Sequence, residues 1–175
     1  MKPLVGPSSD SVGYRATIPS AKRRSPVIRS QKSHAQFDHT AKLEHFSSEI
    51  DQLANIQRQL PATMSATLLV HMERTGITEE ALAEKAQVSP KTISRMRNEQ
   101  HVSIESFIAV CIGLQLHPIL SSDMIGKSDH RFSPGNTAHV AYQILLFEHY
   151  RSSIFECNEW LISQGFKPLG GKSDE

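Results

Sequence analysis

Residues 77–98 carry two helix-start signals separated by a very short interval, and this spacing constrains the fold more than any other feature. Thr78 can cap a first helix, and the two glutamates after it suit the positive end of the helix dipole. Ser89-Pro90 is a second start, an N-cap followed by proline at the first helical position. Small side chains at Ala83 and Ala86 allow two helices to approach closely. The stretch predicts two short helices that cross over a tight turn.

Similar signals predict further helices on both sides of this stretch. One runs from Ser65 to Thr75 and ends at Gly76. Another is capped by Ser103 and breaks at His117-Pro118, and a short helix follows it. No alternating strand pattern and no internal repeat is present. The sequence therefore predicts an all-α domain over residues 62–126.

The same stretch resembles the helix-turn-helix family of phage repressors, the Cro/C1, lambda-repressor-like or XRE type. The resemblance is carried by the run Val88-Ser89-x-x-Thr92-Ile93-Ser94-Arg95 and by six apolar packing positions, which are Leu82, Ala83, Ala86, Val88, Ile93 and Met96. It implies a lambda-repressor-like bundle that binds double-stranded DNA as a bacterial or phage-type transcriptional regulator. A small helical bundle that has this spacing by chance is the alternative.

In that family the third helix of the module enters the major groove, and here it spans about residues 90–98. The residues expected to contact DNA are Ser89, Lys91, Thr92, Ser94, Arg95 and Asn98. Basic side chains suit guanine, asparagine suits adenine, and hydroxyls suit base or phosphate. Two positions depart from the family pattern. Glu79 stands where many members have glutamine, and its carboxylate would repel phosphate. Gln87 stands where glycine is common, so it must adopt a positive φ or a different turn.

Residues 133–170 predict a C-terminal helical hairpin, with helices at 137–150 and 153–164. Ser153-x-x-Glu156 is a capping box, and Gly165 ends the second helix. Its apolar residues Ile154, Cys157, Trp160 and Leu161 are expected to face Val140, Ile144 and Leu145 of the first helix. Residues from about 104 to 170, beginning with Ile108-Ala-Val-Cys-Ile-Gly-Leu-x-Leu-x-Pro118, also resemble bacterial proteins in which such a module follows an IrrE-like zinc metallopeptidase. The zinc motif HExxH is absent, so only the DNA-binding half is implied.

The N-terminal part predicts a basic tail and then an amphipathic helix. Residues 1–33 hold seven basic residues against Asp10 alone, whereas the whole chain has a net charge of only +1. Residues 1–37 are rich in proline and serine, so they predict a disordered leader or a segment that contacts polyanions. Residues 38–61 predict a helix with an apolar stripe, formed by Leu43, Phe46, Ile50, Leu53, Ile56 and Leu60. The stripe either packs on its own domain or pairs with a second chain.

The remaining patterns exclude several classes of protein. Cys111 and Cys157 lie in apolar helical stretches without a CxxC motif, which predicts neither a disulfide nor a zinc site. No apolar run reaches membrane-spanning length, and no secretory signal is recognisable, so a cytoplasmic protein is expected. No catalytic, metal or cofactor site is expected. The sequence therefore predicts DNA binding by a homodimer, with a protein-interaction or assembly module as the alternative function.

Overall fold

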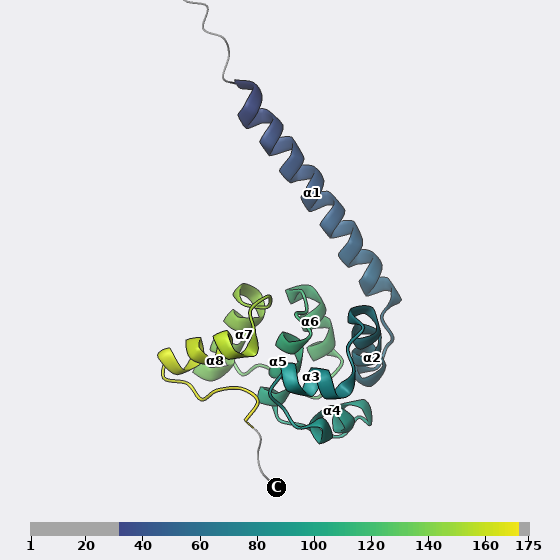
Figure 1. The fold of residues 1–175 in the computed structure, drawn as a ribbon, viewed down its shortest axis with the longest axis vertical. Coiled ribbons are helices and arrows are strands. Elements are labelled where there is room, and N and C mark those ends of the chain that lie inside the picture. The colour runs from purple at the N-terminus through teal and green to yellow at the C-terminus, as the bar shows by residue number, and fades with distance from the viewer. Residues whose placement is uncertain (1–31, 172–175) are drawn as a thin grey trace, which may run out of the picture. The chain divides into compact units, whose positions relative to one another are not determined.

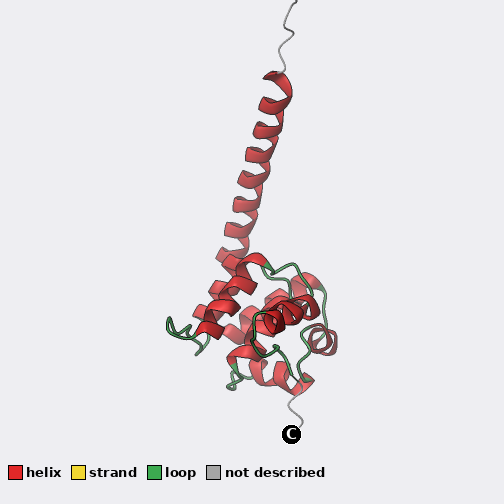
Figure 2. Cartoon of the chain, turned by 90° about the vertical axis from the view of Figure 1, so that its left-hand side faces the viewer, coloured by secondary structure: helices red, strands yellow, loops and turns green. Residues whose placement is uncertain are grey.

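Helices joined by loops make up the described part of the chain, in a computed structural model that gives the backbone of residues 32–171 and the side chains of residues 42–171 (Figure 1, Figure 2). The order is α1 (Lys32–Gln59), α2 (Met64–Thr75), α3 (Glu79–Lys85), α4 (Pro90–Arg97), α5 (Ile104–Gly113), α6 (Pro118–Gly126), α7 (Thr137–Glu148) and α8 (Ile154–Ser163). Over these residues the structure contains no strand. The predicted all-α class is therefore confirmed.

Polar capping residues fix where most of these helices begin. The hydroxyls of Thr78, Ser89, Ser103 and Ser153 each accept a hydrogen bond from the backbone N–H three residues along. These four caps are the predicted ones. At α8 the capping box is complete, because the Ser153 N–H also donates to Oε2 of Glu156 at 2.7 Å. Gly76, with φ of 65°, ends α2 as predicted.

The chain divides into two units between Thr40 and Ala41, and this division falls within α1. The described part of the first unit is the helical stretch 32–40. α1 begins at Lys32, so the prediction that the helix starts at residue 38 was wrong. Neither proline nor glycine occurs between Pro26 and Pro61, so nothing in the sequence stops the helix from extending backwards. The rest of the predicted tail, residues 1–31, lies outside the described residues.

The second unit is organised around α5. Every residue from Phe107 to Gly113 is buried, and α5 packs against α3, α7 and α8. A Cβ atom at Gly113 would lie only 3.0 Å from the Cβ of Ala86, so the end of α5 passes very close to the end of α3. The largest fully buried side chains come from α2 to α8, and they are Leu68, Leu82, Ile93, Met96, Phe107, Ile108, Ile112, Leu116, Leu120, Met124, Leu145 and Leu161. One continuous core therefore joins the predicted central module to the C-terminal hairpin.

Two apolar stripes are only partly buried. In α1, Leu53 and Ile56 pack against the core, as does Leu60 just beyond the helix, whereas Leu43, Phe46 and Ile50 are 56%, 56% and 65% exposed. In α7 the expected inward residues Val140 and Ile144 are exposed instead. α7 instead buries Ala141, Tyr142, Leu145 and Leu146, a face displaced by about one residue from the predicted one. The prediction was correct for Leu145 and wrong for the other two α7 residues.

Both cysteines are free and buried, Cys111 in α5 and Cys157 in α8. Burial raises the pKa of Cys111 to about 12 and that of Cys157 to about 11. Both thiols are therefore protonated at neutral pH and behave as small apolar side chains. Within the described part of the chain, no helix has the length and apolar character needed to cross a membrane.

Candidate nucleic-acid interface

The turn between α3 and α4 is built by a helix cap without glycine. Ala86 closes α3, and Gln87 adopts a φ of 52° in the left-handed region. The N–H of Gln87 donates to the carbonyl of Glu84 at 3.1 Å, and the N–H of Val88 donates to that of Ala83 at 3.0 Å. This is the Schellman arrangement that glycine usually completes. Of the two geometries expected for Gln87, the structure therefore has the positive φ.

The six predicted packing positions all lie inside. Leu82, Ala86, Ile93 and Met96 are fully buried, Ala83 is 2% exposed and Val88 is 3% exposed. α3 packs against α4 and α5, and α4 also packs against α2. Because this inner face of α4 is fixed by apolar contacts, its opposite face is held outward in a defined orientation.

The outward face of α4 carries most of the predicted DNA-contacting residues. Lys91, Ser94, Arg95 and Asn98 are exposed, whereas Ser89 and Thr92 are half-buried at the start of the helix. The Ser89 hydroxyl accepts from the Thr92 N–H at 3.2 Å, and the two hydroxyl oxygens lie 2.9 Å apart. Ser89 and Thr92 therefore serve first as a cap. The exposed side chains of the face belong to the other four positions.

Two of those four side chains already make hydrogen bonds within the protein. Nη2 of Arg95 donates to the carbonyl of His101 at 2.7 Å, and Nδ2 of Asn98 donates to the carbonyl of Ser94 at 2.8 Å. Each side chain keeps further donors, because a guanidinium has five N–H groups and an amide has two. The His101 contact anchors Arg95 to the loop between α4 and α5.

Charge is segregated between the two helices of the pair. α4 carries Lys91, Arg95 and Arg97 and no acidic residue, whereas α3 carries three glutamates and one lysine. Arg97 forms an ion pair with Glu79, the residue expected to repel phosphate. The pair offsets part of that repulsion and leaves Lys91 and Arg95 as the cations of the outward face. Glu80 and Glu84 remain exposed on α3.

A small polar cavity of about 210 Å³ lies against the start of α4. Ser89, Lys91, Thr92 and Arg95 line it, together with Ser106 of α5 and Gly171. Two cations and three hydroxyls around one cavity suit an oxyanion such as a phosphate group. The sequence analysis missed Ser106 and Gly171. Only the Ser103-x-x-Ser106 spacing could have pointed to Ser106, and no local signal marks Gly171.

The segment after α8 reaches the cavity beside α4 because two hydrogen bonds hold its backbone against α8. The Leu169 N–H donates to Oδ1 of Asn158 at 2.7 Å, and Nδ2 of Asn158 donates to the Leu169 carbonyl at 3.1 Å. Gly170 follows with φ of 68°, and a Cβ atom there would lie 2.5 Å from the carbonyl oxygen of Ala86. Gly170 therefore lies against the α3–α4 turn, and Gly171 lies in the cavity lining beside α4.

Among the residues whose side chains are described, no group of three or more histidine, cysteine, aspartate or glutamate side chains could hold a metal ion. The candidate interface consists instead of hydroxyl, amide and basic groups on α4 and its neighbours. A scan against protein-family models and searches of curated proteins and of solved structures found no match for this chain.

Proposed function

We propose that this protein binds double-stranded DNA through α4 and regulates transcription, as a helix-turn-helix module of the phage-repressor type over residues 62–126. The observation that carries the proposal is the exposed face of Lys91, Ser94, Arg95 and Asn98 on a helix whose other face is buried. A major groove admits one α-helix, and the side chains on this face suit base edges.

The cavity beside Ser89 and Lys91 supports a particular docking of that helix. A DNA phosphate in this cavity would meet Lys91, Arg95 and the hydroxyls of the α4 cap. Contacts of this kind set the position of a recognition helix without reading the base sequence. Ser94 and Asn98, further along α4, would then lie over base edges.

The test is DNA affinity measured against salt for the full chain, by fluorescence anisotropy on labelled genomic fragments. The wild type is expected to bind with a steep salt dependence. Lys91→Ala is expected to reduce the slope of log K against log salt by about 0.9, the value for one lost phosphate contact. Arg58→Ala is the matched control, because it removes an exposed arginine of α1 that belongs neither to α4 nor to the cavity lining, and it is expected to leave the slope unchanged. Salt-independent binding, or equal slopes for all three proteins, would refute the proposal.

A second copy of the chain is the partner that we propose for α1. Leu43, Phe46, Ile50 and Leu53 follow the 3-4-3 spacing of a two-stranded coiled coil, and the first three are more than half exposed. Such a seam is self-complementary, so one surface serves both chains of a symmetric dimer. A seam of about two heptads gives only weak pairing, and binding to two half-sites on one DNA would strengthen it.

Sedimentation of the full chain with and without DNA tests this pairing. The wild type is expected to be a concentration-dependent dimer, and Phe46→Ser with Ile50→Ser is expected to be a monomer with unchanged helicity by circular dichroism. Gln52→Ser, an exposed α1 position outside the seam, is the control. A wild type that stays monomeric on DNA carrying two half-sites would exclude the second copy as the partner of this stripe.

A protein-interaction module is the second candidate function. The exposed carboxylates of Glu80 and Glu84 beside α4 favour it, because they would repel an approaching DNA backbone. If the anisotropy experiment detects no salt-dependent DNA binding, that result would support this alternative.

A further inference from the structure

The last described residue of the chain, Gly171, lies where two cavities of opposite charge adjoin. It lines both of them. The first is the polar cavity of about 210 Å³ beside α4, which contains Lys91 and Arg95. The second, of about 540 Å³, lies on the α3 side and contains Glu80 and Glu84. The residues that follow Gly171 therefore start between two cations and two carboxylates.

The backbone before Gly171 is held in place by contacts with α8 and with the α3–α4 turn. Leu169 is buried, and its backbone exchanges two hydrogen bonds with the side chain of Asn158, at 2.7 and 3.1 Å. Gly170 is also buried, because it passes directly against the carbonyl of Ala86. These contacts fix the point from which the following residues extend.

The cations of the polar cavity are available to an anion. Lys91 is exposed and makes no hydrogen bond or ion pair to any described residue. Arg95 uses one N–H group on the carbonyl of His101 and keeps the others. No acidic side chain lines this cavity. A carboxylate that entered it would accept charge-assisted hydrogen bonds from both cations.

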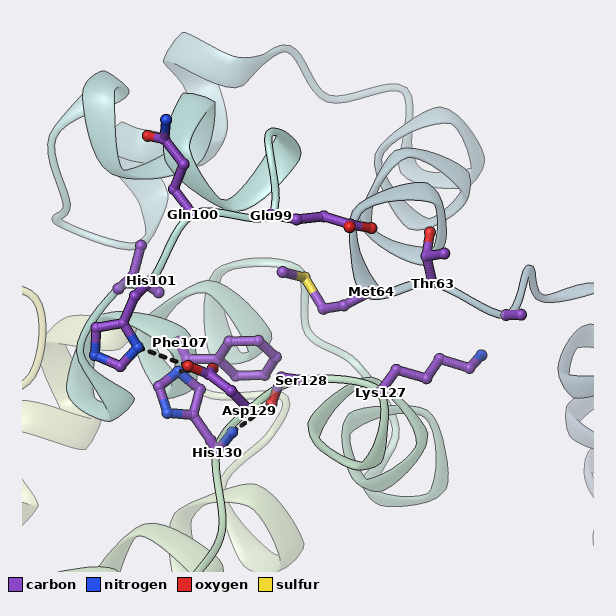
Figure 3. A pocket seen from close by; sticks show the side chains of 12 residues that line it. Thr63, Met64, Glu99, Gln100, His101, Phe107, Lys127, Ser128, Asp129 and His130 are labelled. Carbon is purple, nitrogen blue, oxygen red and sulfur yellow. Dashed lines mark hydrogen bonds and ion pairs between the residues drawn. The ribbon is translucent and has the colours of Figure 1, made fainter.

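The charged groups of a further cavity, of about 400 Å³ where three loops meet α5, already have partners (Figure 3). Its carboxylates, Glu99 and Asp129, are directed to opposite ends, with Phe107 between them (Figure 3). Its acidic and lysine side chains each bond to another side chain, and these pairs are Glu99–Ser65, Asp129–His101 and Lys127–Asp123. The cavity beside α4 differs, because Lys91 has no such partner among the described residues.

The next residues in the sequence carry charges of the kinds that the two cavities lack. They are Lys172, Ser173, Asp174 and Glu175, which lie outside the described residues. A chain advances at most about 3.3–3.6 Å per residue, so Asp174 can lie up to about 10 Å from Gly171. Because Gly171 itself lines the polar cavity, this reach covers it. The ammonium group of Lys172 can in turn reach the glutamates on the α3 side.

We propose that the 172–175 segment docks on its own chain, with the carboxylates of Asp174 and Glu175 in the polar cavity beside α4, where they compete with a DNA phosphate. The carboxylates accept hydrogen bonds from Lys91 and Arg95, and the ammonium group of Lys172 faces the α3 glutamates. Bound DNA and the docked segment exclude each other, so the segment lowers the affinity for DNA. The competition with DNA rests on the proposed function, whereas the docking of the segment does not.

Docking is tested without DNA, by measuring NOEs in the isotope-labelled full chain at neutral pH in a phosphate-free buffer. NOEs are expected between the side chains of Asp174 or Glu175 and that of Thr92, which lines the same cavity. Lys91→Ala is expected to weaken them, because it removes one of the two cations. Lys85→Ala, which removes an exposed lysine outside both cavities, is the matched control and is expected to leave them unchanged.

Three results would contradict the docking or the competition. The absence of these NOEs would overturn the docking. NOEs that appear only between labelled and unlabelled molecules in a mixed sample would assign the cavity to the segment of a second copy, which would overturn docking on the same chain. Inorganic phosphate is expected to abolish the NOEs as its concentration is raised. NOEs that persist in saturating phosphate would refute the competition.

The effect on DNA is tested by anisotropy with the full chain. Asp174→Asn with Glu175→Gln is expected to bind DNA about fivefold more tightly than the wild type, the effect of freeing a site that is occupied in about four-fifths of the molecules. Glu148→Gln with Glu159→Gln removes two exposed carboxylates from α7 and α8 and is the matched control, expected to bind as the wild type does.

The two experiments separate the docking from the proposed function. If the NOEs are present but the 174–175 variant binds DNA no more tightly than the control, the competition is refuted and the docking stands. An equal gain in both variants would refute the competition as well, because it would reflect net charge alone. If no protein binds DNA, the proposed function fails and the NOEs still decide the docking.

Discussion

Acid is expected to destabilise this protein through one buried histidine. His71 of α2 is fully buried, and neither of its ring nitrogens makes a hydrogen bond to any described residue. Burial is the main reason why its pKa is lowered from 6.5 to about 4. Arg74 and Lys127 lower the pKa further, and Asp123 opposes them. The imidazole is therefore neutral in the folded protein at every pH above about 4.

The size of this loss of stability follows from the linkage between protonation and folding. Below pH 6.5 the unfolded chain takes up a proton at His71 that the folded protein does not, so stability decreases as the pH falls. The loss amounts to about 1.4 kcal/mol for each pH unit and reaches about 3 kcal/mol near pH 4, where the folded protein also becomes protonated. Above pH 7 this group has no effect on the pH dependence.

Replacing His71 by leucine, a side chain of similar size, isolates this contribution. At pH 7.5 the variant is expected to be as stable as the wild type or more stable by about 1–2 kcal/mol, because two unsatisfied polar atoms leave the core. Urea unfolding followed by circular dichroism at pH 7.5, 6.5, 5.5 and 4.5 measures both proteins. The gap between them is expected to widen by about 3 kcal/mol towards acid. A gap that stays constant over the series would refute the reasoning, since it would mean that His71 titrates in the folded protein as it does in the unfolded chain.

Three substitutions test local features of the fold by thermal unfolding. Gln87→Gly is expected to stabilise by about 0.5–1 kcal/mol, because glycine adopts the positive φ of this turn without a Cβ penalty, and an unchanged or lower melting temperature would contradict this. Gly170→Ala is expected to lower the melting temperature, because the new Cβ would collide with the Ala86 carbonyl, and Gly171→Ala, where the space is open, is the control. Ser153→Ala is expected to cost about 1 kcal/mol by removing the α8 cap, and a neutral effect would show that the cap contributes little.

The starts of α3, α4, α5 and α8 could be predicted because their signals are local. A capping hydroxyl and a following proline act through bonds to the next few residues, and Ser89-Pro90 and the Ser153 box needed no tertiary context. The buried face of α4 was predictable for a related reason, since its apolar residues recur at one helical spacing. What lay beyond prediction depends on packing between distant segments. The sequence of α7 is apolar over so wide an arc that it did not reveal which part faces inward, so Val140 and Ile144 were misplaced.

The residues of the candidate sites likewise include some that local patterns reveal and others that only tertiary folding brings together. Lys91, Ser94 and Arg95 follow from helical periodicity once α4 is recognised. Ser106 and Gly171 reach the same cavity only through tertiary folding. Glu99 adopts a left-handed conformation without any glycine to signal it, and its carboxylate joins a cavity with residues from the loop after α6. Such a cavity has no continuous sequence signature.

The labelling rates of the two buried thiols can be used to measure the stability of two regions of the protein. Because only a thiolate reacts, and both cysteines are protonated and enclosed, a thiol reagent can modify either one only when the surrounding structure opens. Cys111 lies in the central helix and Cys157 in the hairpin, so their separate labelling rates measure the opening free energies of two regions in a single sample. Equal rates would mean that the hairpin and the central module unfold as one cooperative unit. Faster labelling of Cys157 would identify the hairpin as a region that detaches while the rest stays folded.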